Sequence, residues 1–213
     1  MDLSRRCESL ERTTAVDRRP CYSSFIDSHQ FSDVMPRVDK SVFISYRRSN
    51  FPWAVATFLE LTHNGYDVFF DYMGVASGAF DRVIIENIRG RAHFLVLLTP
   101  SALERCADAK DWLRREIEAA LDSKRNVVTL FLEGFDIDDP KIKGQLTGKL
   151  AVLPEYQGLK IVPEYFLEGM KKLRESYLNV TLDAVLHPTS VAAQSAATDL
   201  RNLVTQPRRR RAR

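Results

Sequence analysis

The sequence of 213 residues lacks the features that mark membrane, secreted or zinc-binding proteins. No apolar run approaches the roughly 20 residues that a membrane-spanning helix needs. The N-terminal segment is basic but has no apolar stretch of the kind found in secretory signals. Cys7, Cys21 and Cys106 are widely spaced and form no C-x-x-C pair. This pattern favours free thiols in a reducing compartment, so we expect a cytoplasmic chain without a metal site.

Several familiar catalytic signatures are also missing. There is no G-x-G-x-x-G after the first apolar strand and no G-x-S-x-G elbow. The stretch GQLTGK at 144–149 is one residue short of a phosphate-binding loop and continues with Leu150. The four histidines are scattered, and His93 lies inside an apolar stretch, as a structural histidine would. A P-loop NTPase, a zinc enzyme and a hydrolase triad therefore lack support.

The composition is that of an ordinary globular protein, with 45% hydrophobic and 28% charged residues. The net charge is only +3, but five arginines fall in the last six residues, 208–213. Such a tail could neutralise the phosphates of nucleic acid or membrane lipids. A solvated terminus is the favoured interpretation, because charged chain ends are usually mobile.

Apolar strands alternate with helical patterns between residues 39 and 178. This alternation predicts an α/β fold with a parallel sheet and right-handed crossovers. A weakly structured arm at 1–38 and a C-terminal extension at 179–213 flank this domain. In the extension we expect mobility, with a short amphipathic piece at 197–204. The strands are expected at 41–46, 66–70, 92–98, 126–132 and 159–162, and the helical regions at 51–64, 80–90, 99–123 and 164–177.

The stretch DWLRREIEAAL, residues 111–121, poses the functional question. Leu113 and Ile117 belong to a buried helical stripe, while Trp112 and Glu116 lie four residues apart, about 100° around the helix. This pair is either a surface tryptophan with a solvated glutamate or half of an active site. In open parallel sheets the ligand cleft lies beyond the carboxyl ends of the strands. That rule places the cleft near 46–48, the loop at 71–79 and the region after Thr99.

Four segments together resemble the Toll/interleukin-1 receptor (TIR) domains. They are FISYRRSN, FDYMGVASGAF, FLVLLTPSALERC and DWLRREIEAAL, in the order and spacing of that family. The resemblance covers about 40–178 and is strongest to stand-alone, bacterial-like members that consume NAD+. It implies a flavodoxin-like fold, with a five-stranded parallel sheet flanked by helices.

The resemblance also implies roles for particular residues. Glu116 matches the catalytic glutamate and Trp112 the aromatic residue four positions earlier. The family carries a tryptophan after the fourth strand in its animal NAD+-cleaving members, where this sequence offers only Phe135 or Ile137. The other residues implied to bind substrate are Tyr46, Arg47, Arg48, Asp71 and Phe80. The alternatives are a surface position for one of the two arginines, a loop-capping role for Asp71 and a packing role for Phe80. The residues implied to form the assembly loop are Tyr72, Met73, Gly74, Ser77 and Gly78.

The implied reaction requires few catalytic groups. Nicotinamide leaves NAD+ as a neutral molecule, so one carboxylate can stabilise the oxocarbenium-like transition state without a general acid. NAD+ would be the substrate, and no cofactor is expected. Attack by water would give ADP-ribose, and attack by the adenine or a ribose hydroxyl a cyclic product. We expect an NAD+ glycohydrolase or cyclase, activated by TIR–TIR self-assembly or by a protein partner, in immune or cell-death signalling. The alternative is a non-catalytic TIR scaffold.

Overall fold

The computed structural model describes residues 38–72, 78–182 and 186–205, with only the backbone for 78–80 and 205. The expected arm at 1–38, apart from residue 38, and the arginine tail at 208–213 lie outside these ranges. The described part contains a five-stranded sheet in the order β2-β1-β3-β4-β5, with every pair parallel. The strands are β1 (Ser41–Ser45), β2 (Asp67–Phe70), β3 (His93–Leu98), β4 (Asn126–Phe131) and β5 (Gln157–Lys160). This is the predicted flavodoxin-like α/β fold.

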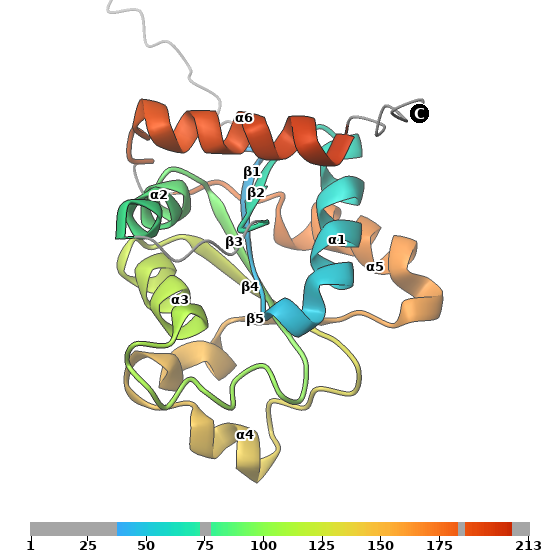
Figure 1. Ribbon diagram of the computed structural model, residues 1–213. Coiled ribbons are helices and arrows are strands. Elements are labelled where there is room, and N and C mark those ends of the chain that lie inside the picture. The colour runs from blue at the N-terminus through green and yellow to red at the C-terminus, as the bar shows by residue number, and fades with distance from the viewer. Residues whose placement is uncertain (1–37, 73–77, 183–185, 206–213) are drawn as a thin grey trace, which may run out of the picture. The chain divides into compact units, whose positions relative to one another are not determined.

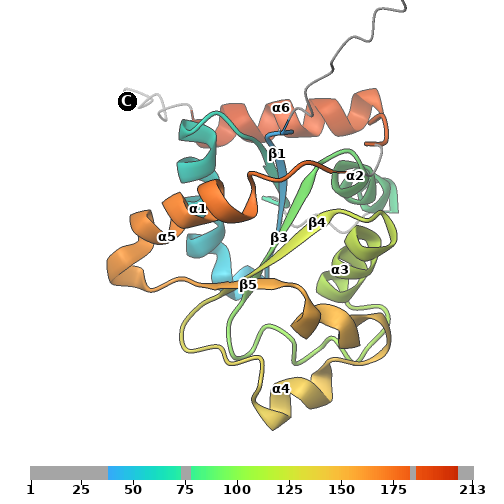
Figure 2. The ribbon, with the colours of Figure 1, turned by 180° about the vertical axis from the view of Figure 1, so that it is seen from behind.

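Helices cover both faces of the sheet (Figure 1). Two helices, α2 and α3, lie on one face, and α1 and α5 lie on the other, as the view from behind also shows (Figure 2). The helices are α1 (Phe51–His63), α2 (Gly78–Arg89), α3 (Trp112–Asp122), α4 (Pro140–Gln145), α5 (Phe166–Lys172) and α6 (Val191–Thr205). Shorter helical turns are η1 (Arg48–Asn50), η2 (Gly148–Glu155), η3 (Pro163–Tyr165) and the π-type turn η4 (Leu173–Tyr177).

The central strand β3 is completely buried, which explains its continuous apolar sequence. His93, its first residue, is buried too, with Nε2 2.8 Å from the Asp39 carbonyl oxygen and Nδ1 2.9 Å from Asn126 Nδ2. Both ring nitrogens have partners, so the prediction of a structural histidine is confirmed.

One of the sequence expectations is wrong, and two others are confirmed with changed limits or helix type. Residues 100–110 form consecutive turns, so α3 begins at Trp112 instead of continuing a helix from Thr99. The helix expected at 80–90 starts earlier, at Gly78, which shortens the loop after β2. The single closing helix expected at 164–177 is divided into η3, α5 and η4.

The expectation of mobility in the C-terminal extension is wrong for residues 191–205. They form α6, which is longer than the predicted piece at 197–204 and packs on α2 and β2 (Figure 1). Ala193, Ala197 and Leu200 are buried there, and Asn87 Nδ2 lies 3.4 Å from the Ala193 carbonyl oxygen. The helix buries a narrow stripe of small side chains, which lets it approach its neighbours closely.

Candidate functional site

The strand order locates the cleft. The chain leaves β1 for β2 on one side and later returns to β3 on the other side, so the topological switch point lies between β1 and β3. Asn50 Nδ2, beyond the end of β1, donates to Thr99 Oγ1, beyond the end of β3, at 3.0 Å. The segments after these two strands and the start of α3 therefore meet at the position that the sequence predicts.

Glu116 lies inside this meeting point. It belongs to α3, whose buried face also carries Leu113, Ile117 and Ala120, and its own exposure is only 7%. Ser45, the last residue of β1, is 1% exposed and donates a short hydrogen bond from Oγ to Glu116 Oε2. Glu116 is therefore a buried and oriented carboxyl group, unlike the solvated helix glutamate that its sequence neighbours alone would indicate.

This environment shifts the protonation of Glu116. Burial raises its pKa from 4.5 to about 8, because a desolvated carboxylate is poorly stabilised. The hydrogen bond from Ser45 and the charge of Arg47 lower the pKa, while the charges of Asp71 and Asp111 raise it. The group is consequently poised to ionise when a cation approaches it.

Arg47 fixes the position of α3. Its side chain is buried and forms a two-pronged ion pair with Asp111, with Nη1–Oδ2 and Nη2–Oδ1 distances of 2.6 and 2.8 Å. Its Nε donates to the Ala102 carbonyl at 2.6 Å. Asp111 is the N-cap of α3 and accepts from the Arg114 backbone N–H at 3.2 Å. Burial alone would raise the pKa of Asp111, but the hydrogen bonds from Arg47 and Arg114 hold it below its usual range.

Arg48 fixes the beginning of the segment after β2. Its Nη1 donates to the Tyr72 carbonyl at 2.8 Å and its Nη2 lies 3.1 Å from Asp71 Oδ2. The Tyr46 hydroxyl donates to the Asp71 carbonyl at 2.7 Å, and burial raises the pKa of this phenol. Half of the Arg48 side chain, 48%, remains exposed. Both arginines expected near a pyrophosphate are thus engaged with the protein's own carboxylates.

The remaining residues implied for substrate binding and assembly are only partly described. Met73, Gly74 and Ser77 lie outside the described residues, while Tyr72 lies at the edge of them. Gly78 and Phe80 are described by their backbone alone, as part of α2.

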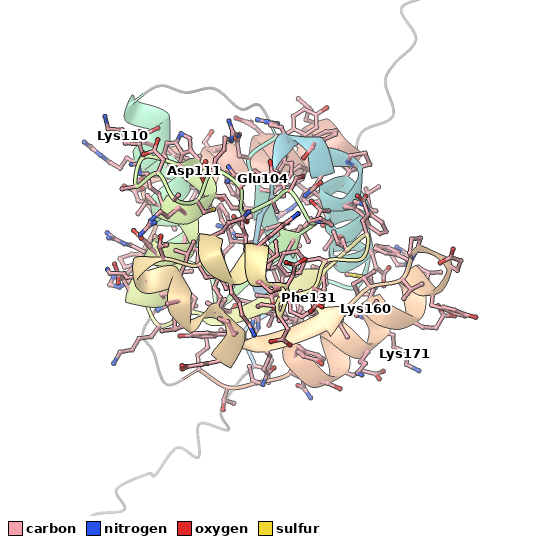
Figure 3. The ribbon with its side chains drawn as sticks, turned by 90° about the horizontal axis from the view of Figure 1, so that it is seen from below. Glu104, Lys110, Asp111, Phe131, Lys160 and Lys171 are labelled. Atoms are coloured by element: carbon pink, nitrogen blue, oxygen red, sulfur yellow. The ribbon has the colours of Figure 1, made fainter. Side chains whose placement is uncertain are left out.

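Trp112 borders a cavity of about 510 Å³ between the start of α3 and the turns that precede it. Figure 3 shows three of its lining residues, Glu104, Lys110 and Asp111, on the same side of the domain. The guanidinium of Arg115 covers the Trp112 ring, with Cζ 4.1 Å from the ring centroid. Phe135, offered in place of a pocket tryptophan, is instead buried with its ring 5.3 Å from that of Phe131.

Sequence reasoning missed Ser45, Asp111 and Arg115. Ser45 and Glu116 are 71 residues apart, and Arg47 and Asp111 are 64 apart, so only the fold reveals these contacts. The sequence signal for Asp111 was its place before the helical stripe, where an aspartate favours an N-cap.

Among the residues that the structure describes, no three His, Cys, Asp or Glu side chains are grouped so that they could hold a metal ion. Within the same ranges, no helix has the length and apolar character needed to cross a bilayer.

Residues 42–156 match the family described as TIR domain. Three similar proteins are named NAD(+) hydrolases. NAD(+) hydrolase tir-1 of Caenorhabditis elegans is 32% identical over 130 residues, which is 58% of this chain and 13% of that protein. NAD(+) hydrolase sarm1 of Drosophila melanogaster is 34% identical over 146 residues, 62% of this chain and 10% of that protein. NAD(+) hydrolase SARM1 of Danio rerio is 30% identical over 136 residues, 62% of this chain and 18% of that protein.

The chain therefore spans less than a fifth of the length of each of these relatives. A solved TIR-domain assembly, the activated Roq1 resistosome directly recognizing the pathogen effector XopQ, superposes loosely, with a TM-score of 0.37 and 15% identity over 78% of this chain and 99% of that chain. The family assignment rests instead on the match over 42–156, which exceeds half of the sequence, and on the parallel sheet that contains it. On this evidence the chain belongs to the TIR domain family.

Proposed function

We propose that this chain cleaves the bond between nicotinamide and ribose in NAD+. The observation that carries the proposal is the buried carboxyl group of Glu116, held by Ser45 at the switch point of the sheet, four residues after Trp112 on α3. The names of the three NAD(+) hydrolases support the same reaction.

The chemistry suits a single carboxylate. As nicotinamide departs with the bonding electron pair, positive charge develops on the ribose, and an ionised Glu116 stabilises that charge. Glu116 must be deprotonated to do this. The positive charge of the bound nicotinamide ring favours the ionised form and so lowers the raised pKa of Glu116 during binding.

Completion of the reaction requires a nucleophile. Water gives ADP-ribose, whereas the adenine or a ribose hydroxyl gives a cyclic ADP-ribose. We propose hydrolysis as the principal reaction, because it is the reaction in the names of the relatives. Immune or cell-death signalling is the setting that the resemblance implies.

The closed state of the site supports activation by assembly. Glu116 is 7% exposed and one face of the Trp112 ring is covered by Arg115, so a substrate can reach this carboxyl group and this ring face only if neighbouring groups move. We propose that docking of a second TIR domain at the 72–78 loop produces this movement. The limited access to Glu116 also favours a second candidate function. This is a non-catalytic scaffold that acts by TIR–TIR contacts.

The test is NAD+ loss with products separated by chromatography, at high protein concentration with a crowding agent. Glu116→Gln keeps the shape of the side chain and removes its charge, and should lower kcat by at least about 100-fold. Glu118→Gln is the matched control, because Glu118 lies on the same helix and pairs with Arg114 at 2.8 Å. It should remain active. If the wild type cleaves no NAD+ even when assembled, the scaffold function takes precedence.

A separate measurement tests whether activity depends on assembly. Specific activity should rise steeply with protein concentration, because the active form contains more than one chain. A specific activity that stays constant over the accessible range would contradict this part of the proposal.

A further inference from the structure

The face of Trp112 is occupied by a cation of the protein itself. Arg115 follows Trp112 by three positions on α3, a spacing that puts the two side chains on one face of the helix. The Arg115 Cζ atom lies 4.1 Å from the centre of the ring, well inside the range of cation–π attraction. A planar guanidinium over an indole also gains from stacking, which an ammonium group does not.

A carboxylate on the neighbouring helix keeps the guanidinium there. Arg115 Nη1 lies 3.6 Å from Asp81 Oδ2. Asp81 is the fourth residue of α2, the helix that begins directly after residues 73–77. The two side chains are 39% and 32% exposed, and exposed pairs of this kind contribute only about 0–1 kcal/mol. Arg115 is therefore held over the ring weakly enough to be displaced.

The nicotinamide ring of NAD+ resembles the Arg115 guanidinium, which it would have to displace from Trp112. Both are flat, both carry one delocalised positive charge, and both favour the electron-rich face of an indole. A neutral ring such as free nicotinamide lacks this charge and competes less well. The Arg115 guanidinium is thus an internal substitute for a pyridinium ring.

We propose that Arg115 is a specificity-determining residue that stacks on Trp112 when no substrate is bound and gives way to the pyridinium cation of the substrate. The inference rests on the proposed function for the identity of that cation. Removal of Arg115 frees the ring and also removes a like charge, so pyridinium binding becomes tighter. Glu116 is unaltered by this change, so the effect falls on KM more than on kcat.

The experiment measures binding without turnover. The probe is 1-methylnicotinamide, a pyridinium cation without ribose or phosphate, titrated into the full chain. The protein has two tryptophans, so the two indole N–H signals in an NMR spectrum report on Trp112 and Trp53 separately. Trp53 donates to Glu133 at 2.7 Å on a different helix and is the internal reference. A Trp112→Phe variant assigns the signals.

Arg115→Gln should lower the Kd for 1-methylnicotinamide about 3- to 10-fold, the size of one cation–π contact, and shift the Trp112 signal alone. Arg82→Gln removes an exposed positive charge beside Asp81 and should change the Kd less than about twofold. Neutral nicotinamide should gain less than the cation in Arg115→Gln, because it benefits from the freed ring but not from loss of the like charge, and it should respond little to Arg82→Gln. The KM for NAD+ should fall in Arg115→Gln while kcat changes less than about twofold.

An unchanged or higher Kd in Arg115→Gln would overturn the inference, and so would an equal decrease in Arg82→Gln, which would indicate general charge. These outcomes are separate from failure of the proposed function. If 1-methylnicotinamide binds as expected but NAD+ is not cleaved, Arg115 still governs a pyridinium site and only the chemistry is lost. If NAD+ is cleaved but Arg115→Gln leaves both Kd and KM unaltered, only the role of Arg115 is refuted.

Discussion

At the scale of single residues, the carboxyl group of Glu116 links activity to stability. Its pKa is raised from 4.5 to about 8 by burial, so between these pH values the folded protein keeps a proton that the unfolded chain releases. Folding stability must then decrease as the pH rises through this window. At about 1.4 kcal/mol per pKa unit the full loss is on the order of 5 kcal/mol.

Glu116→Gln should remove this loss, because glutamine does not titrate. The free energy of unfolding of Glu116→Gln minus that of the wild type should increase between pH 5 and pH 9, measured by urea unfolding. Glu118→Gln should follow the wild type at every pH. Parallel curves for Glu116→Gln and the wild type would mean that Glu116 ionises normally in the folded protein.

If the proposed function holds, Ser45 should control the pH at which NAD+ cleavage begins. Its hydroxyl donates to Glu116 Oε2 and so favours the ionised form. Ser45→Ala should move the acidic limb of kcat/KM to higher pH by about one unit, and activity should recover at alkaline pH. A uniform loss of activity at every pH would assign Ser45 to packing instead.

The sequence predicted the candidate pair Trp112 and Glu116 better than the contacts around it. Trp112 and Glu116 follow from helical spacing and from the TIR resemblance. Ser45 and Arg115 escaped notice because their partners depend on how β1 and α2 lie against α3. The expectation that Arg47 faces a pyrophosphate stays untested, but Arg47 is committed to Asp111, a contact that sequence spacing cannot show.

At the scale of elements, the Arg47–Asp111 pair attaches the first turn of α3 to the end of β1. Both side chains are at most 10% exposed. Asp111→Asn would leave the charge of Arg47 buried without its partner, which typically costs about 3–5 kcal/mol. We expect this loss in the free energy of unfolding, measured in urea.

Asp122→Asn is the matched control, because Asp122 pairs with Lys149 at 2.6 Å while both are more than half exposed. It should cost less than about 1 kcal/mol. Equal effects of the two substitutions would refute the structural role of the pair.

The elements themselves were mostly predictable. The strands follow from apolar runs, and the predicted limits differ from the observed ones by at most two residues. The turns at 100–110 were misjudged because Ala102, Leu103 and Cys106 are buried at a spacing that resembles a helix. Their carbonyl groups are used differently, since the Ala102 carbonyl accepts from Arg47 and the Cys106 carbonyl accepts from Arg114. Arginine side chains from outside these turns thus donate to carbonyl groups that backbone N–H groups would satisfy in a helix.

At the scale of the whole described domain, α6 was the least predictable part. Residues rich in alanine, serine and threonine indicated a mobile extension, because such a stretch offers little apolar area. The close approach of this segment to α2 compensates for its small apolar area. A Cβ added at Gly90 would lie only 2.3 Å from Thr189 Cγ2, so the chain before α6 runs directly against the end of α2. Ion pairing adds to the packing, since Arg201 Nη2 lies 2.5 Å from Asp67 Oδ1 at the start of β2.

If α6 is an integral part of the domain, its buried and exposed leucines must differ in their effect on stability. Leu200 is 6% exposed and Leu203 is 54% exposed, only three residues away on the same helix. Leu200→Ala should lower the free energy of unfolding by about 2–4 kcal/mol, through lost burial and a new cavity. Leu203→Ala should change it by less than about 0.5 kcal/mol.

One cooperative unfolding transition is expected for both variants, measured by circular dichroism in urea. Two transitions, or equal small effects of both substitutions, would mean that α6 folds and detaches on its own. A single transition would mean instead that β2 and α2, the elements on either side of residues 71–77, are held by a helix beyond the residues that match the TIR family.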